Sequence, residues 1–169
     1  GKTATAVNLA AALARRAPVL LVDLDPQTSA SLSLGIDTEA PTLADVLFRG
    51  VPVADAIRTT NTEGLNILPA SIDLAGGDIT LTGTRTHGRE RALRDALQPL
   101  RNRYAYIIID CPPAFSLLTV NAIVASNAAM IPTPADYLAV QGLANAANGL
   151  REIAAQFGAP VALLGILIT

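Results

Sequence analysis

The chain opens on three residues, Gly1-Lys2-Thr3, whose types and order suit contact with the phosphates of a nucleotide. A glycine lets the backbone approach a phosphate closely because it has no Cβ. Lys2 would place a compact charge on the β- and γ-phosphate oxygens, and the Thr3 hydroxyl would ligate Mg²⁺. An Ala- and Leu-rich stretch follows, and a helix over residues 3–16 would point its free N–H groups at the phosphates.

This tripeptide is short, so it needs support from the rest of the chain. The full pattern is a glycine, four further residues and then Gly-Lys-Ser/Thr, so its first half would precede Gly1. The chain also starts without Met, inside the motif. We therefore expect a fragment that lacks its first strand and the front of a phosphate-binding loop.

The first supporting feature is an apolar run over residues 18–24 that leads to Asp23 and Asp25. Side chains two residues apart on a strand point the same way, so both carboxylates are expected to face the ligand crevice at the carboxyl edge of a parallel sheet. The alternative is a plain polar strand end where Asp25-Pro26 opens a turn. We favour the first interpretation because the strand follows directly on the predicted phosphate-loop helix.

A second buried strand, over residues 104–110, ends at Asp110 and is stopped by Cys111-Pro112-Pro113. An aspartate delivered to the same sheet edge can bind Mg²⁺ or a water on it. The alternative, a strand that merely ends in Asp, is weaker once Lys2 and Thr3 are considered. Cys111 is expected to be an inert thiol beside this strand.

The remaining pattern alternates helices and strands, which predicts an α/β domain of three layers with a mainly parallel sheet. Residues 27–36 would form a short helix or a mobile switch, residues 82–88 a loop, and residues 71–81 are ambiguous. Further helices are expected over 42–48, 53–58, 89–100, 116–126 and 138–157, and further strands over 65–69, 128–131 and 161–168. Residues 1–169 would make one domain, which fits this length.

The composition agrees with this class. With 51% hydrophobic but only 4% aromatic residues, the core must be aliphatic, as in a sheet buried by helices on both faces. The net charge of -2 gives no electrostatic sign of nucleic-acid binding, and a single Cys excludes an internal disulfide framework. Asp, Pro or Gly interrupts each apolar run before it could span a bilayer, so a cytoplasmic protein is expected.

Four motifs in this order resemble those of ParA/Soj-type partition ATPases, which carry a deviant Walker A motif and belong to the MinD/ParA superfamily. The motifs are Gly1-Lys2-Thr3, Asp23-Leu24-Asp25-Pro26-Gln27, Ile109-Asp110-Cys111-Pro112-Pro113 and Leu118-Thr119-Val120-Asn121-Ala122. The resemblance runs through nearly the whole chain. It implies a P-loop NTPase fold of three α/β/α layers, truncated at both ends, with its first strand missing.

The resemblance also implies roles for particular residues. The catalytic residues would be Lys2 and Asp25, with Asp25 positioning the attacking water. The nucleotide-binding residues would be Gly1, Lys2, Thr3 and Ala4, and the metal residues Thr3, Asp23 and Asp110. The cofactors would be ATP and Mg²⁺.

The family further implies a switch that cycles between an ATP-bound homodimer on non-specific DNA and a monomer. A ParB-like centromere-binding partner would stimulate hydrolysis during chromosome or plasmid partitioning at the nucleoid, without a membrane. The chain departs from the family at Ala4, Thr28-Ser29 and Ala114, where Thr, Gly-Asn and Ser are usual. The signature lysine would precede Gly1, and adenine contacts and basic DNA-binding residues would follow Thr169.

The sequence leaves several other functions open. A MinD-like membrane-cycling ATPase, or another cargo-positioning ATPase, shares the architecture, and only the Asp-Pro-Gln motif favours the partition branch. A non-hydrolysing, nucleotide-gated binding module would not need Asp25. An electron-transfer ATPase needs cluster-ligating cysteines, and a dinucleotide-binding dehydrogenase needs a Gly-x-Gly-x-x-Gly motif; the chain has neither.

Overall fold

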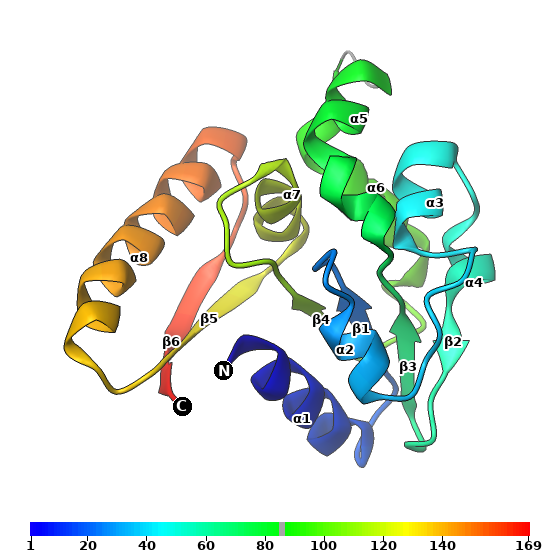
Figure 1. Ribbon diagram of the computed structural model, residues 1–169, viewed down its shortest axis with the longest axis horizontal. Helices are drawn as coiled ribbons and strands as arrows, with labels where there is room; N and C mark the ends of the chain where they lie inside the picture. Colours follow the sequence, from blue (N-terminus) through cyan, green and yellow to red (C-terminus); the bar gives the residue numbers. More distant parts are fainter. Residues whose placement is uncertain (85–86) are drawn as a thin grey trace.

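The structure, a computed structural model, describes residues 1–84 and 87–169 and is built around a four-stranded sheet (Figure 1). The strand order is β2-β3-β1-β4, and β1 pairs in parallel with β3 and with β4. The short strand β2 is antiparallel to β3. The strands are β1 (Val19–Asp23), β2 (Arg58–Thr59), β3 (Leu65–Leu68) and β4 (Tyr106–Asp110). The predicted α/β class with a mainly parallel sheet is confirmed.

Helices cover both faces of this sheet because β1 is apolar on both sides, as expected for a central parallel strand. Val19 and Leu21 pack against α1 (Lys2–Ala14) and Ala30 of α2 (Ser29–Ser33). Leu20 and Val22 face a larger core on the other side. That core is built largely from α3 (Leu43–Arg49), α4 (Val53–Ala56), α5 (Gly77–Thr84), α6 (Ala92–Leu97) and α7 (Leu117–Ala125).

A second, two-stranded parallel sheet joins β5 (Ala128–Thr133) to β6 (Ala162–Ile168), and α8 (Tyr137–Phe157) packs on β5. The helix α1 contacts both β4 and β5, so it packs against a strand of each sheet (Figure 1).

Among the described residues no strand pairs with the outer edge of β4. A hollow of about 200 Å³ lies between the loop after β4, α7, α8 and β5. A first strand preceding Gly1 stays a prediction from the sequence.

Several predicted element boundaries are wrong. The helix expected over 53–58 ends at Ala56, and Arg58 instead pairs with Ile67 in β2, which was not predicted. The stretch 89–100 is not one α-helix, because 3-10 turns flank α6 on both sides, over Arg89–Arg91 and Gln98–Leu100, the latter containing Pro99. The ambiguous stretch is a 3-10 turn, Ile72–Gly76, followed by α5, which extends to Thr84 into the predicted 82–88 loop. Residues 85–86 of that loop lie outside the described residues.

No helix within residues 1–84 and 87–169 combines the length and the hydropathy that a membrane crossing requires.

Candidate nucleotide-binding site

The amino end of α1 is the part of the site that sequence motifs locate most directly. Gly1 precedes the helix, and its carbonyl accepts the N–H of Thr5 at 2.9 Å. The first-turn N–H groups of a helix have no partner within the helix, and no acidic residue occupies this turn. Lys2 and Ala4 are exposed and Thr3 is half-buried. This helix end can therefore receive an anion.

The pairing of β1 with β4 brings two aspartates to the same sheet edge. Asp23 lies directly across from Asp110 in the parallel register, and each is the last residue of its strand. The N–H of Leu24 donates to the Asp110 carbonyl at 2.9 Å, so the two chains stay together just beyond the strands. The predicted meeting of both carboxylates at one edge is confirmed.

Asp110 is a buried carboxylate that lacks part of its expected hydrogen bonding. The residue is 2% exposed, and its Oδ2 atom has no hydrogen-bond partner among the described residues. The pKa of Asp110 is raised to about 6, mainly by burial and also by the negative charges of Asp23 and Asp25, while the hydrogen bond from Thr3 and the charge of Lys2 oppose the rise. Lys2, Thr3, Asp23 and Asp25 therefore all lie close enough to Asp110 to affect its carboxylate.

This orphaned oxygen fits a divalent cation. A buried polar atom without a partner is costly, and Mg²⁺ prefers oxygen ligands. Yet no group of three or more His, Cys, Asp or Glu side chains among the described residues could hold a metal ion. Mg²⁺ usually keeps several waters and uses one or two carboxylates plus substrate phosphates. The arrangement thus suits a nucleotide-borne Mg²⁺ bound by Thr3 and Asp110 better than a protein-only cage.

Asp23 is fully buried, and its carboxylate accepts hydrogen bonds from Ser31. The backbone N–H and the hydroxyl of Ser31 both donate to Asp23 Oδ2, each at 2.8 Å. Burial raises the pKa of Asp23, while the hydrogen bonds from Ser31 and from Asp25 oppose that rise. The Asp23 carboxylate is therefore held next to Asp110 by protein donors.

Asp25 lies beyond the last residue of β1, so the strand alternation predicted for Asp23 and Asp25 does not extend to it. It sits in a tight turn: its Oδ1 accepts the N–H of Gln27 and its carbonyl accepts the N–H of Thr28, both at 2.9 Å. Thr28 has a φ of 56°, which is unusual for a residue that is not glycine. The turn leaves Asp25 half-buried at the rim of the site.

The chain has one cysteine and one histidine, and neither is among the proposed site residues. Burial raises the pKa of the Cys111 thiol to about 12, so it is not a nucleophile near neutral pH. His87 is exposed on the surface. Ser31, by contrast, was missed by sequence reasoning, because a serine in a small, polar stretch gives no signal of burial.

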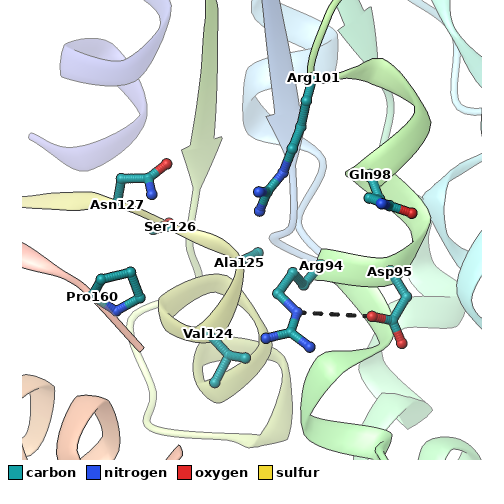
Figure 2. A pocket seen from close by; sticks show the side chains of 9 residues that line it. All are labelled: Arg94, Asp95, Gln98, Arg101, Val124, Ala125, Ser126, Asn127 and Pro160. Carbon is teal, nitrogen blue, oxygen red and sulfur yellow. Dashed lines mark ion pairs between the residues drawn. The ribbon is translucent and has the colours of Figure 1, made fainter. Parts of the chain in front are cut away.

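A larger hollow, of about 490 Å³, is lined by a different set of residues (Figure 2). Its lining comes from the end of α6, the end of α7 and the approaches to β5 and β6, so it opens at the amino ends of the strands. Figure 2 shows Arg94 and Arg101 beside it, with Arg94 paired to Asp95 at 3.8 Å. None of the motif residues lines it, and it is not the nucleotide site.

Comparison with known proteins gives a consistent result across the chain. A sequence profile of the AAA domain family matches residues 1–161. The sporulation initiation inhibitor protein Soj of Bacillus subtilis (strain 168) is 41% identical over 172 residues, which cover 100% of this chain and 67% of that protein. The chromosome partitioning protein ParA of Myxococcus xanthus (strain DK1622) is 40% identical over 174 residues, covering 100% of this chain and 60% of that protein.

The folds of solved structures agree with these sequence matches. A crystal structure of cobyrinic acid a,c-diamide synthase from Mycobacterium smegmatis, with bound ADP and magnesium, superposes with a TM-score of 0.92 at 36% identity. The match covers 99% of this chain and 68% of that one. The chain thus spans roughly two thirds of the length of the relatives that it matches.

Proposed function

The chain belongs to the ParA/Soj family of P-loop partition ATPases, and from that premise we propose that it is the nucleotide-binding and ATP-hydrolysing part of a DNA-segregation switch. Its cofactors are ATP and Mg²⁺. The proposed cycle alternates an ATP-bound homodimer on non-specific DNA with a monomer, and a ParB-like centromere-binding partner stimulates hydrolysis. The protein would act at the nucleoid in the cytoplasm.

One observation carries most of this proposal: the orphaned, buried Oδ2 of Asp110 lies in the same site as Thr3 at the open amino end of α1. A helix end that receives phosphate, a hydroxyl and an uncompensated carboxylate together match what a nucleotide with its metal ion requires. Burial without a donor disfavours the ionised carboxylate, and a bound cation would remove that penalty.

The proposed roles follow from this placement. Gly1, Lys2, Thr3 and Ala4 bind the phosphates through backbone N–H groups and the Lys2 charge. Thr3 and Asp110 hold the metal, with Asp23 near it. When bound, Mg²⁺ neutralises charge on the phosphate oxygens.

Asp25 would orient the attacking water in line with the γ-phosphate. Its turn holds the carboxylate at the rim, where water has access. We regard it as a water-orienting residue, because phosphoryl transfer is catalysed mainly by positioning and charge stabilisation. Turnover would therefore be slow until DNA and the partner complete the site.

The direct test is ATP hydrolysis by the intact protein, measured alone, with DNA, and with DNA plus its ParB-like partner. We expect slow basal turnover that rises about tenfold or more when DNA and the partner are both present. Charge stabilisation supplied by a partner protein can achieve an increase of this size. If neither DNA nor the partner changes the rate of ATP hydrolysis, the result would instead favour another cargo-positioning ATPase. Release from lipid vesicles on hydrolysis would favour the MinD-like alternative.

A non-hydrolysing, nucleotide-gated module is the remaining alternative. It would bind ATP and DNA in the same assay but release no phosphate under any condition. The intact Asp25 turn argues against it, since a binding module has no need of a water-orienting carboxylate at this position.

A further inference from the structure

Ser31 is a fully buried serine whose donors both converge on one carboxylate oxygen. It lies in α2, the short helix that follows the Asp25 turn, and is 0% exposed. Its N–H and hydroxyl both donate to Asp23 Oδ2 at 2.8 Å. Hydrogen bonds to an ionised carboxylate are stronger than neutral ones, so this double contact fixes Asp23 firmly.

The same hydroxyl also accepts a hydrogen bond. The N–H of Ala70, just after β3, donates to Ser31 Oγ at 3.3 Å. One hydroxyl therefore joins the residues that follow β3 to the carboxylate at the end of β1. Its single proton goes to Asp23 and a lone pair accepts from Ala70, so it both donates and accepts.

Asp23 is also hydrogen-bonded to the backbone of Asp25. Its second oxygen, Oδ1, accepts the backbone N–H of Asp25 at 3.3 Å. The contacts thus run from Ala70 through Ser31 and Asp23 to the backbone of the proposed water-orienting residue. Within the described part of the chain, the Ser31 side chain hydrogen-bonds to Asp23 and to no other residue proposed to contact nucleotide or metal.

We propose that Ser31 is a positioning residue for hydrolysis: its hydroxyl holds Asp23, and through Asp23 the Asp25 turn, in the geometry that water attack needs. This rests on the proposed ATPase function. Small misplacements of a positioning group can cost large factors in rate without loss of binding. A serine that only completed a buried hydrogen-bond network would affect stability alone.

Ser33 offers a matched control on the same helix. Its hydroxyl donates to the carbonyl of Ala30 at 2.8 Å, and the residue is exposed. Ser33→Ala therefore removes a hydroxyl from α2 without breaking the connection to Asp23. It should leave turnover, nucleotide affinity and the melting temperature close to those of the wild type.

The decisive comparison is Ser31→Thr against Ser31→Val in the intact protein. Both variants add the same branched bulk at a buried position, but only threonine keeps a hydroxyl. We expect kcat to be about tenfold lower in Ser31→Val than in Ser31→Thr, with the Kd for a fluorescent ATP analogue within about threefold between them. Melting temperature is recorded for each so that kcat refers to folded protein.

Ser31→Ala extends the test if the branched residues prevent folding, because it adds no bulk. It should show the same loss of kcat at unchanged nucleotide affinity. Equal kcat values with and without the hydroxyl, in protein shown to be folded, would overturn the role of Ser31 and leave the ATPase proposal standing. Wild-type protein that binds ATP but does not hydrolyse it would overturn both.

Discussion

At the scale of single residues, Asp110 shows how burial prepares the site for a cation. The strand β4 delivers its carboxylate into the edge of the sheet, where one oxygen has no donor among the described residues. In the unfolded chain its pKa returns to the ordinary value of 3.8, whereas in the fold it is about 6. Between these values the folded state holds a proton that the unfolded state has lost.

A pH titration of stability should reveal this residue. As pH rises from about 4 to about 6, the nucleotide-free protein should lose stability, by up to about 3 kcal/mol from Asp110, because the fold disfavours the ionised carboxylate. Urea unfolding at several pH values measures this slope. Asp110→Asn should make the slope shallower; the raised pKa of Asp23 leaves a remainder of the same sign. An unchanged slope in Asp110→Asn would contradict the assignment.

At the scale of elements, the buried side chain of Asn121 joins α7 to α6. Its Oδ1 accepts the N–H of Leu93 at 3.0 Å, and its amide donates to the carbonyls of Arg89 and Leu117, both at 2.9 Å. Asn121→Ala would leave the buried N–H of Leu93 unpaired and remove two part-buried hydrogen bonds, and should cost about 2–4 kcal/mol in the free energy of unfolding. Asn148→Ala, at an exposed site, should change it by less than about 0.5 kcal/mol. Chemical denaturation compares the two, and equal effects would refute this role.

The turn into β3 depends on Gly64 for a different reason. It has a φ of 77°, and a Cβ there would lie 2.6 Å from the carbonyl oxygen of Ala14 at the end of α1. Gly50 has a similar φ of 72° but open space around it. Gly64→Ala should therefore destabilise the protein by at least about 1 kcal/mol more than Gly50→Ala, since only the first adds a backbone clash. Thermal unfolding of both variants measures the difference. Equal losses of stability would contradict this, because they would mean that the positive φ sets the cost and the contact with Ala14 adds nothing.

At the scale of the whole molecule, the fold class and the main strands were predictable because buried parallel strands are continuous apolar runs. The runs over residues 18–24 and 104–110 became β1 and β4 with boundaries shifted by one or two residues. The two-residue strand β2 was not predictable, because its pairing with β3 is a tertiary contact. The 3-10 turns around α6 were also missed, since propensity does not separate them from a helix.

The site was predictable to a similar extent. Glycine, lysine, threonine and aspartate in a phosphate-loop pattern are identifiable in the sequence itself, and the register of β1 with β4 confirms that Asp23 and Asp110 meet. The inward connection of Asp23 to Ser31 was not predictable, because it depends on the path of α2 back over the strand end. The roles of Asp23, Asp110 and Ser31 in hydrolysis remain predictions.

The most direct test of the account is to measure ATP binding and ATP hydrolysis side by side in the wild type, Asp25→Ala and Asp37→Ala. Asp37 is a matched control, since its Oδ1 also accepts the N–H two residues later, from Glu39 at 3.2 Å, but in an exposed loop. We predict that Asp25→Ala binds ATP with a Kd within about threefold of the wild type and loses hydrolysis by about 100-fold, as loss of a positioned reactant can cause. Asp37→Ala should match the wild type in both. Hydrolysis that persists in Asp25→Ala, or that falls equally in Asp37→Ala, would contradict the account.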